Sequence, residues 1–256
     1  MLIRSGDVMT EDLTIFSQKD RVSGVLDKMN NSSFDVAPIK ISGYIRKYVR
    51  RKDLAEANQT DIIINHAEPL EEDDLIGTEV PVIDPSPGSR DILKILDERD
   101  MRFAFIMGDG IEGIITHADL NGVRAGVPLY RLISEYEGAA CDLVHDEVEN
   151  GRWMSQLSNN RQGDLQEIYQ SQVEEDADLR LVDCLNTRQI HNIIREYGLV
   201  DQLGFETERA EKVMDDIEML RNDVMHQRPV VGKHSFSEFV GIVSDLKQAN
   251  QALNQR

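Results

Sequence analysis

The stretch Gly113-Ile114-Ile115-Thr116-His117-Ala118-Asp119-Leu120 decides the fold of the N-terminal half of this chain. Its first three residues indicate a short apolar strand that ends at Thr116. Before it, the apolar residues at 103–107 indicate another strand, and those at 92–96 indicate a helix. Val80-Pro81-Val82-Ile83 indicates a first strand. Residues 78–125 therefore predict one unit in the order strand, helix, strand, strand and short helix.

Residues 9–56 repeat this order of elements. The expected elements are a strand at 13–16, a helix over 22–29, strands at 36–39 and 44–49, and a short helix from 52. Leu26 and Leu93 are 67 residues apart, and Asp53 and Asp119 are 66 apart. A near-constant offset through the same order of elements indicates an internal repeat.

The repeat resembles a tandem CBS-domain pair, an α/β module of two β-α-β-β-α units. Residues 113–120 match the Gly-apolar-apolar-Thr/Ser-x-x-Asp signature of that family. The resemblance covers about residues 7–125 and places the domain at 1–128. It implies that the module binds an adenine nucleotide (AMP, ADP or ATP) as a regulatory ligand.

The resemblance also implies the residues that would bind the nucleotide in the second copy. Thr116 and the N–H groups of the following helix would hold a phosphate. Asp119 would accept hydrogen bonds from both ribose hydroxyls, and His117 could approach the phosphate. Val80 and Val82 would sandwich the adenine.

The first copy departs from the signature. Its matching segment, Lys47-Tyr48-Val49-Arg50-Arg51-Lys52-Asp53, has no glycine and carries Arg50 where Thr is expected. Asp53 is kept, and an arginine can bind phosphate more strongly than a threonine. The alternative is that the start of a helix has accumulated basic residues.

A second informative stretch is Arg221-Asn222-Asp223-Val224-Met225-His226. It ends an amphipathic helix whose apolar set is Ala210, Val213, Met214, Ile217, Leu220 and Val224. Arg221 falls on this stripe, where a guanidinium costs free energy unless it is paired or used. Asn222 and His226 are four residues apart and therefore share one side of the helix.

These six residues resemble the motif of the HEPN family, in which an Arg and a polar residue precede a His. The layout of residues 129–256 also fits this all-α, helical-bundle family. Further helices are expected at 129–144 and 179–197, the motif helix stops before 229, and a last helix begins at 235. The plainer alternative is that Arg-Asn is common near helix ends and that His226 only favours the helix dipole.

The HEPN resemblance implies a metal-independent endoribonuclease with RNA as substrate. The RNA 2′-hydroxyl would attack the adjacent phosphorus and leave a 2′,3′-cyclic phosphate. His226 would act as general base or acid, Arg221 would neutralise charge on the phosphoryl oxygens, and Asn222 would orient the phosphate or the imidazole. The site would be composite across a homodimer axis.

A competing hypothesis is a non-catalytic nucleotide sensor whose helical domain serves dimerisation or partner docking. The charge distribution favours it. The net charge is −19, and residues 129–256 carry thirteen Lys/Arg against twenty-four Asp/Glu. RNA would be repelled except at a local basic patch, and no binding to DNA is expected.

Other features set the protein class. We expect a cytoplasmic protein without a membrane partner, because no apolar run has membrane length and no signal-peptide core is present. Cys141 and Cys184 are expected to be reduced packing residues. The sequence has no Cys/His cluster and predicts no metal site, and the acidic run at 174–178 reads as an exposed loop.

Overall fold

The computed structural model describes residues 3–84, 86, 89–174 and 179–256. By its internal contacts the chain forms two compact units. One consists of Arg4–Pro81 and Glu98–Leu120, and the other of Met1–Ile3, Val82–Asp97 and Asn121–Arg256. We call them the sheet unit and the helical unit. The acidic run beyond Glu174 lies outside the described residues.

The first copy of the repeat forms a four-stranded sheet. Its elements are β1 (Phe16–Ser17), α2 (Val22–Asn31), β2 (Val36–Ile41), β3 (Tyr44–Arg50), α3 (Arg51–Ala55) and β4 (Glu68–Pro69), in the sheet order β1-β2-β3-β4. β1 and β2 are parallel, and the other pairs are antiparallel. Val22, Val25 and Met29 of α2 are buried against Ala37 and Ile39 of β2. The predicted order is confirmed here, although the first strand is limited to its last predicted residue and the next one.

The second copy supplies a three-stranded sheet in the order β5-β6-β7. Its strands are β5 (Leu75–Gly77), β6 (Phe103–Met107) and β7 (Ile111–Thr116), followed by a 3₁₀ turn, η3 (Asp119–Asn121). A short N-terminal helix, α1 (Ser5–Val8), precedes Thr10, which bridges to Ile114 of β7. Tyr48 of β3 packs against Phe103 and Phe105 of β6, with ring centroids 5.2 and 5.9 Å away. The two copies therefore share an aromatic core.

The strand expected at Val80-Pro81-Val82-Ile83 is wrong. Only an isolated bridge between Pro81 and Arg4 forms there, and a proline has no N–H to donate to a ladder. β5 (Leu75–Gly77) instead occupies the sheet edge, parallel to β6.

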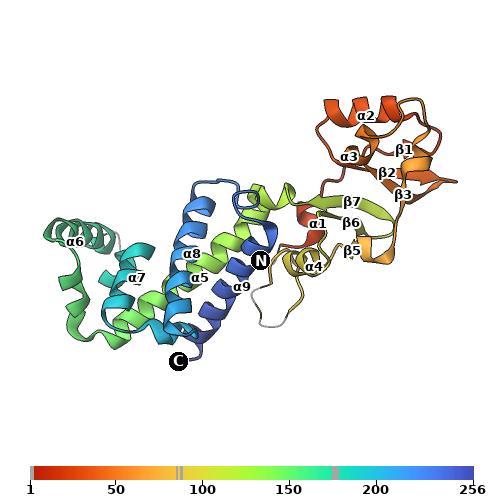
Figure 1. The fold of residues 1–256 in the computed structure, drawn as a ribbon. Helices are drawn as coiled ribbons and strands as arrows, with labels where there is room; N and C mark the ends of the chain where they lie inside the picture. Colours follow the sequence, from red (N-terminus) through yellow and green to blue (C-terminus); the bar gives the residue numbers. More distant parts are fainter. Residues whose placement is uncertain (1–2, 85, 87–88, 175–178) are drawn as a thin grey trace. The chain divides into compact units, whose positions relative to one another are not determined.

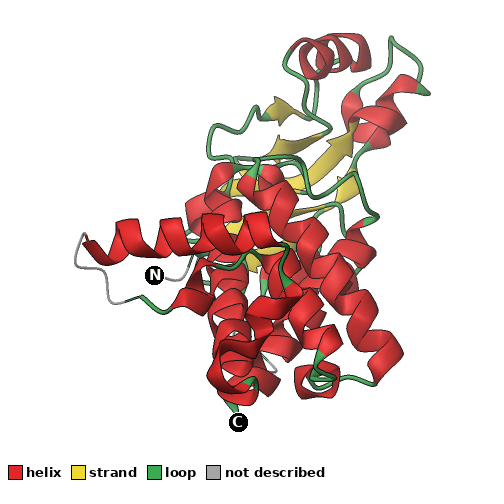
Figure 2. Ribbon diagram, turned by 90° about the vertical axis from the view of Figure 1, so that its left-hand side faces the viewer, coloured by secondary structure: helices red, strands yellow, loops and turns green. Residues whose placement is uncertain are grey.

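The helical unit is a bundle of helices, which Figure 2 draws in red, and Figure 1 shows one long helix running through it. Its helices are α4 (Ile92–Glu98, with Glu98 counted in the sheet unit), α5 (Val123–Glu147), α6 (Asn159–Glu174), α7 (Thr187–Glu196), α8 (Thr207–Met225) and α9 (Phe236–Asn254). Three 3₁₀ segments connect them: η4 (Glu149–Gln156), η5 (Leu181–Cys184) and η6 (Val200–Leu203). α5 contacts α7, α8 and α9. Among the described residues, no helix combines the length and the apolar character that a membrane span needs.

Two helix predictions need correction. The helix expected at 179–197 is broken into η5 and α7, because Asn186 caps α7 by accepting a hydrogen bond from the Gln189 N–H at 3.0 Å. The helix expected to begin at Leu129 begins at Val123, so Pro128 lies inside α5. This proline costs one backbone hydrogen bond, and the apolar contacts of the rest of α5 offset the loss. α6 was not predicted.

α4 is tied to α9 by a buried carboxylate. Asp91 is 1 % exposed, and its Oδ1 accepts a hydrogen bond from the N–H of Lys94 at 3.0 Å, which caps the start of α4. Its Oδ2 pairs with Lys247 of α9. Residues 82–97 therefore also make polar contacts with the rest of the helical unit.

The core of the helical unit contains a histidine. Nε2 of His191 in α7 lies 2.9 Å from the Tyr136 hydroxyl of α5, and His191 Nδ1 has no partner among the described residues. Burial, followed by the charge of Arg195, lowers the pKa of His191 from 6.5 to about 3. Both cysteines are free thiols; Cys141 is buried, which raises its pKa to about 12.

Candidate functional site

The end of β7 brings Thr116 and Asp119 together, as the sequence predicts. Oδ2 of Asp119 accepts hydrogen bonds from the backbone N–H and the hydroxyl of Thr116, both at 2.7 Å. Thr10 Oγ1 donates to Oδ1 at 3.1 Å. A carboxylate offers about four acceptor positions, so one remains on Oδ1. A ribose would share Oδ1 or displace Thr10.

The structure gives less direct support to the other residues of the second copy that were predicted to contact the nucleotide. His117 Nε2 donates to the carbonyl of Met101 at 3.0 Å. Burial lowers the pKa of His117. The hydrogen bond to the Met101 carbonyl partly offsets this decrease, and the charge of Arg102 lowers the pKa further. Val80 is half-buried in the sheet unit, whereas Val82 is 1 % exposed and belongs to the helical unit. Their contact with an adenine stays a prediction.

In the first copy, Arg50 is already held by two carboxylates. Its Nε donates to Asp53 Oδ2 at 2.8 Å, and its guanidinium also pairs with Glu68 of β4. The Tyr48 hydroxyl donates to the other oxygen of Glu68 at 2.6 Å. The bond to Asp53 raises the pKa of Arg50, and burial raises that of Tyr48, so the guanidinium stays charged and the phenol neutral. A phosphate would compete with carboxylates here.

On α8, the buried face does not follow the predicted stripe to its end. After Leu220 the buried position is Asp223, while Val224 and Arg221 are half-buried. Arg221 Nε donates to Glu137 of α5 at 3.4 Å, and its guanidinium also reaches the Asn222 side-chain oxygen at 3.3 Å. The arginine expected on an apolar face is therefore paired at its edge.

The three motif residues are only partly brought together. Arg221 and Asn222 share a hydrogen bond, whereas His226 is the exposed C-cap residue, joined to Asn222 through its backbone N–H at 3.2 Å. Among the residues that the structure describes, no hydrogen bond links the His226 imidazole to either side chain. The convergence of all three on one phosphate stays a prediction.

Asp223 is a residue that the sequence analysis missed. Its side chain is 3 % exposed and pairs with Lys233 at 2.7 Å, while its carbonyl accepts the N–H of Arg228 at 2.8 Å. The loop after α8, residues 226–235, is thereby fastened to the helix that it leaves. The only signal was an acidic residue three positions after Leu220, which helical spacing places on the buried face.

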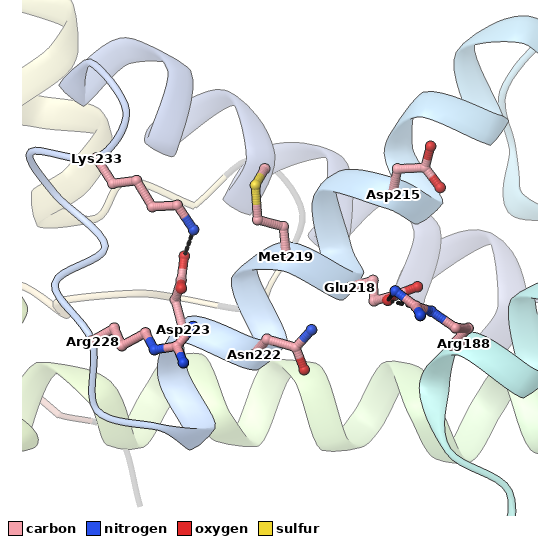
Figure 3. A pocket seen from close by; sticks show the side chains of 8 residues that line it. All are labelled: Arg188, Asp215, Glu218, Met219, Asn222, Asp223, Arg228 and Lys233. Atoms are coloured by element: carbon pink, nitrogen blue, oxygen red, sulfur yellow. Dashed lines mark hydrogen bonds and ion pairs between the residues drawn. The ribbon is translucent and has the colours of Figure 1, made fainter.

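A surface hollow of about 360 Å³ opens beside the motif helix. Figure 3 shows its lining residues: Arg188, Asp215, Glu218, Met219, Asn222, Asp223, Arg228 and Lys233. Arg188 pairs with Glu218 at 2.6 Å, and Lys233 with Asp223. Within the described part of the chain, no acidic side chain pairs with Arg228. The hollow therefore offers one free guanidinium and the amide of Asn222 to an anionic ligand.

The described residues contain no group of three or more His, Cys, Asp or Glu placed to hold a metal ion.

Comparison with known proteins found no matching family model and no matching curated protein. The structural neighbours are CBS-domain proteins that cover about the N-terminal half. A hemolysin-like protein containing a CBS domain, from Oenococcus oeni PSU, is 15 % identical over 46 % of this chain and 86 % of its own (TM-score 0.37). The CBS domain of the bacterial CNNM/CorC family Mg²⁺ transporter in complex with ATP is 15 % identical over 46 % and 83 % (0.37). A conserved CBS domain protein, TA0289, from Thermoplasma acidophilum is 15 % identical over 47 % and 68 % (0.39).

The fold and the site together define a two-part architecture. The N-terminal half is CBS-like α/β, with two related β-α-β-β units and a Thr-x-x-Asp junction after β7. It is joined to a helical C-terminal region, α5–α9.

Proposed function

We propose that this chain is an adenine-nucleotide-regulated, metal-independent endoribonuclease. It combines a tandem CBS module (1–128) with a HEPN-like helical domain (129–256). One observation carries the catalytic part: Arg221 is held half-buried at the end of α8 by Glu137 and Asn222. A guanidinium fixed by two side chains is oriented before a phosphate arrives.

The chemistry assigned to the motif needs only side chains. His226 takes the proton from the RNA 2′-hydroxyl as that oxygen bonds to phosphorus, or gives a proton to the departing 5′-oxygen. Arg221 stabilises the charge on the non-bridging oxygens, and Asn222 orients the phosphate. The products are a 2′,3′-cyclic phosphate and a 5′-hydroxyl. The exposure of His226 at the helix end supports access by RNA.

Regulation is assigned to the Thr116–Asp119 junction. The Thr116 N–H and hydroxyl fix the Asp119 carboxylate at the strand end. A fixed carboxylate loses little freedom on binding ribose. AMP, ADP and ATP share that ribose and are the ligands proposed.

A homodimer completes the proposal. Val123, Val127 and Tyr130 follow helical spacing along one side of α5 and are 72, 50 and 51 % exposed. An apolar stripe of this kind supports an interface between two copies. Pairing would bring a second motif helix to a composite site.

The competing function is a nucleotide sensor without catalysis. The specific observation in its favour is that Glu137 already neutralises Arg221, and that Asp215, Glu218 and Asp223 line the adjacent hollow. These three carboxylates are paired with Arg195, Arg188 and Lys233, so the hollow has little net positive charge to attract an RNA phosphate.

Incubation of the purified protein with total RNA tests the proposal. The arms are protein alone, protein with AMP, ADP or ATP, and each of these with EDTA. Cleavage that leaves 2′,3′-cyclic phosphate ends, persists in EDTA and changes with nucleotide is the expected result. If no arm cuts RNA while nucleotide still binds, the sensor function replaces the enzyme.

A further inference from the structure

The loop after the motif helix is held by an asparagine from a distant part of the sequence. Asn121 Oδ1 accepts hydrogen bonds from the backbone N–H groups of Val230 at 3.0 Å and Val231 at 2.8 Å. Its Nδ2 donates to the carbonyl of Val231 at 3.0 Å. One side-chain amide thus satisfies three backbone groups about 110 positions along the chain.

This loop, residues 226–235, leads from His226 and carries two of the basic residues of the hollow. Arg228 and Lys233 lie on either side of the segment that Asn121 holds. Val230 is 5 % exposed, which fixes the centre of the loop. The position of Asn121 therefore constrains where Arg228 and Lys233 stand.

Asn121 is also two residues from the proposed nucleotide ligand. Asp119 and Asn121 are the first and last residues of η3, and Leu120 between them is 2 % exposed. Asp119 and Asn121 are joined through one residue of the same 3₁₀ turn, so a change in the backbone at Asp119 reaches Asn121 along the chain itself. A ribose that displaces Thr10 from Asp119 would change the set of bonds that holds η3.

We infer that Asn121 is a positioning residue that transmits nucleotide occupancy at Thr116 and Asp119 to the loop 226–235. The inference rests on the nucleotide site of the proposed function, and it is independent of whether the chain cuts RNA. Nucleotide binding shifts η3, η3 carries Asn121, and Asn121 sets the loop that bears Arg228 and Lys233. Coupling of this kind requires that nucleotide binds better to one arrangement of the loop than to the other.

Hydrogen exchange on the full chain tests this, with calorimetry on the same samples. In wild type, saturating ATP or AMP should change the exchange rate of the Val230 and Val231 amides several-fold. Asn121→Ala should raise their exchange about tenfold without ligand, because their acceptor is lost. In that variant nucleotide should still bind, but exchange in 226–235 should no longer respond to it.

Two further variants separate transmission from a general loss of order. Asn121→Asp keeps the acceptor oxygen and should keep part of the response. Asn254→Ala removes an exposed amide that makes one local bond to the Asn250 carbonyl, and its response should equal that of wild type. These variants remain informative if Asn121→Ala does not fold.

The experiment distinguishes failure of this inference from failure of the proposed nucleotide site. If wild type binds nucleotide and the loop does not respond, or if Asn121→Ala responds as wild type does, the inference is overturned and the proposed function stands. If calorimetry shows no heat with AMP, ADP or ATP, the nucleotide site itself is absent and both fail.

Discussion

Lys233 places its ammonium 2.7 Å from the carboxylate of Asp223, which is 3 % exposed in the middle of the Arg221–His226 motif. The pair joins the buried face of α8 to the loop that follows it. A buried carboxylate destabilises the fold unless a cation is paired with it. The loop supplies that cation, Lys233, to Asp223 of α8.

Removing the cation should therefore cost more than removing a surface cation. Lys233→Met leaves Asp223 without its counter-charge, and we expect a loss of about 1–3 kcal/mol in the free energy of unfolding, measured in urea. Arg188→Met is the matched control, because Arg188 is 73 % exposed and its partner Glu218, at 17 %, is less buried than Asp223. Equal losses for the two variants would show that burial of Asp223 does not matter.

Asp119→Ala should weaken nucleotide binding. The carboxylate is held at the strand end, and its loss removes hydrogen bonds worth about 1.5–3 kcal/mol, or about 10–150-fold in Kd by calorimetry. Asp53→Ala is the control at the equivalent position of the first copy, where Arg50 already occupies the carboxylate. Its effect should be smaller, and the reverse ranking would assign the main site to the first copy.

Arg221→Ala and His226→Ala should each slow RNA cleavage by about 10²–10⁴, the usual scale for a charge-stabilising or acid–base group. Cleavage is followed by gel with end-group analysis. His145→Ala, an exposed histidine of α5, should cut at the wild-type rate. Activity that survives both motif substitutions, or that vanishes with EDTA, contradicts the assigned mechanism.

Light scattering should give about twice the 29.1 kDa mass of one chain. Val127→Glu introduces a charge into the exposed stripe of α5 and should shift the mass toward that of one chain. Val173→Glu on α6 is the control, since Val173 is 44 % exposed outside the stripe. A single-chain mass for wild type across micromolar concentrations would refute the dimer.

The buried histidine makes stability depend on pH in a defined direction. The pKa of His191 is lowered from 6.5 to about 3 by burial, so the unfolded chain binds a proton first as pH falls. The stability contribution of the neutral imidazole is full above pH 6.5 and is lost as pH falls from 6.5 toward 3. His191→Gln cannot titrate there, so its melting temperature should fall less than that of wild type between pH 7 and 5. Parallel curves would show that His191 is not the group responsible.

The sequence predicted the elements that have strong apolar patterns. α2, α8 and α9 lie where residue spacing placed them, because one buried face of each helix repeats about every 3.6 residues. β6 and β7 lie at continuous apolar runs whose successive residues are buried. The break before α7 could also have been read, since Asn186 and Gln189 form a capping box. The prediction of a strand at 80–83 was wrong because this apolar run contains Pro81, which has no N–H to donate to a ladder.

The polar parts of the sites were not predictable in the same way. Thr116 and Asp119 are three residues apart, so a local motif was enough to bring them together. Other polar contacts join residues that are farther apart in the sequence, and no periodicity predicts such partners. Examples are the contacts of Glu68 with Arg50, of Asn121 with Val230, and of Lys233 with Asp223.

The two compact units are interleaved along the chain. Residues 82–97 are inserted between parts of the sheet unit, yet their buried Asp91 is neutralised by Lys247 near the C-terminus. A protease that cut once at 120–121 would not free the helical half, because residues 82–97 also belong to it and Asp91 pairs with Lys247 of α9. Gene fusions or deletions that treat residue 128 as a clean joint would leave Lys247 without its carboxylate. Residues 82–97 and the C-terminal helices are therefore expected to unfold together.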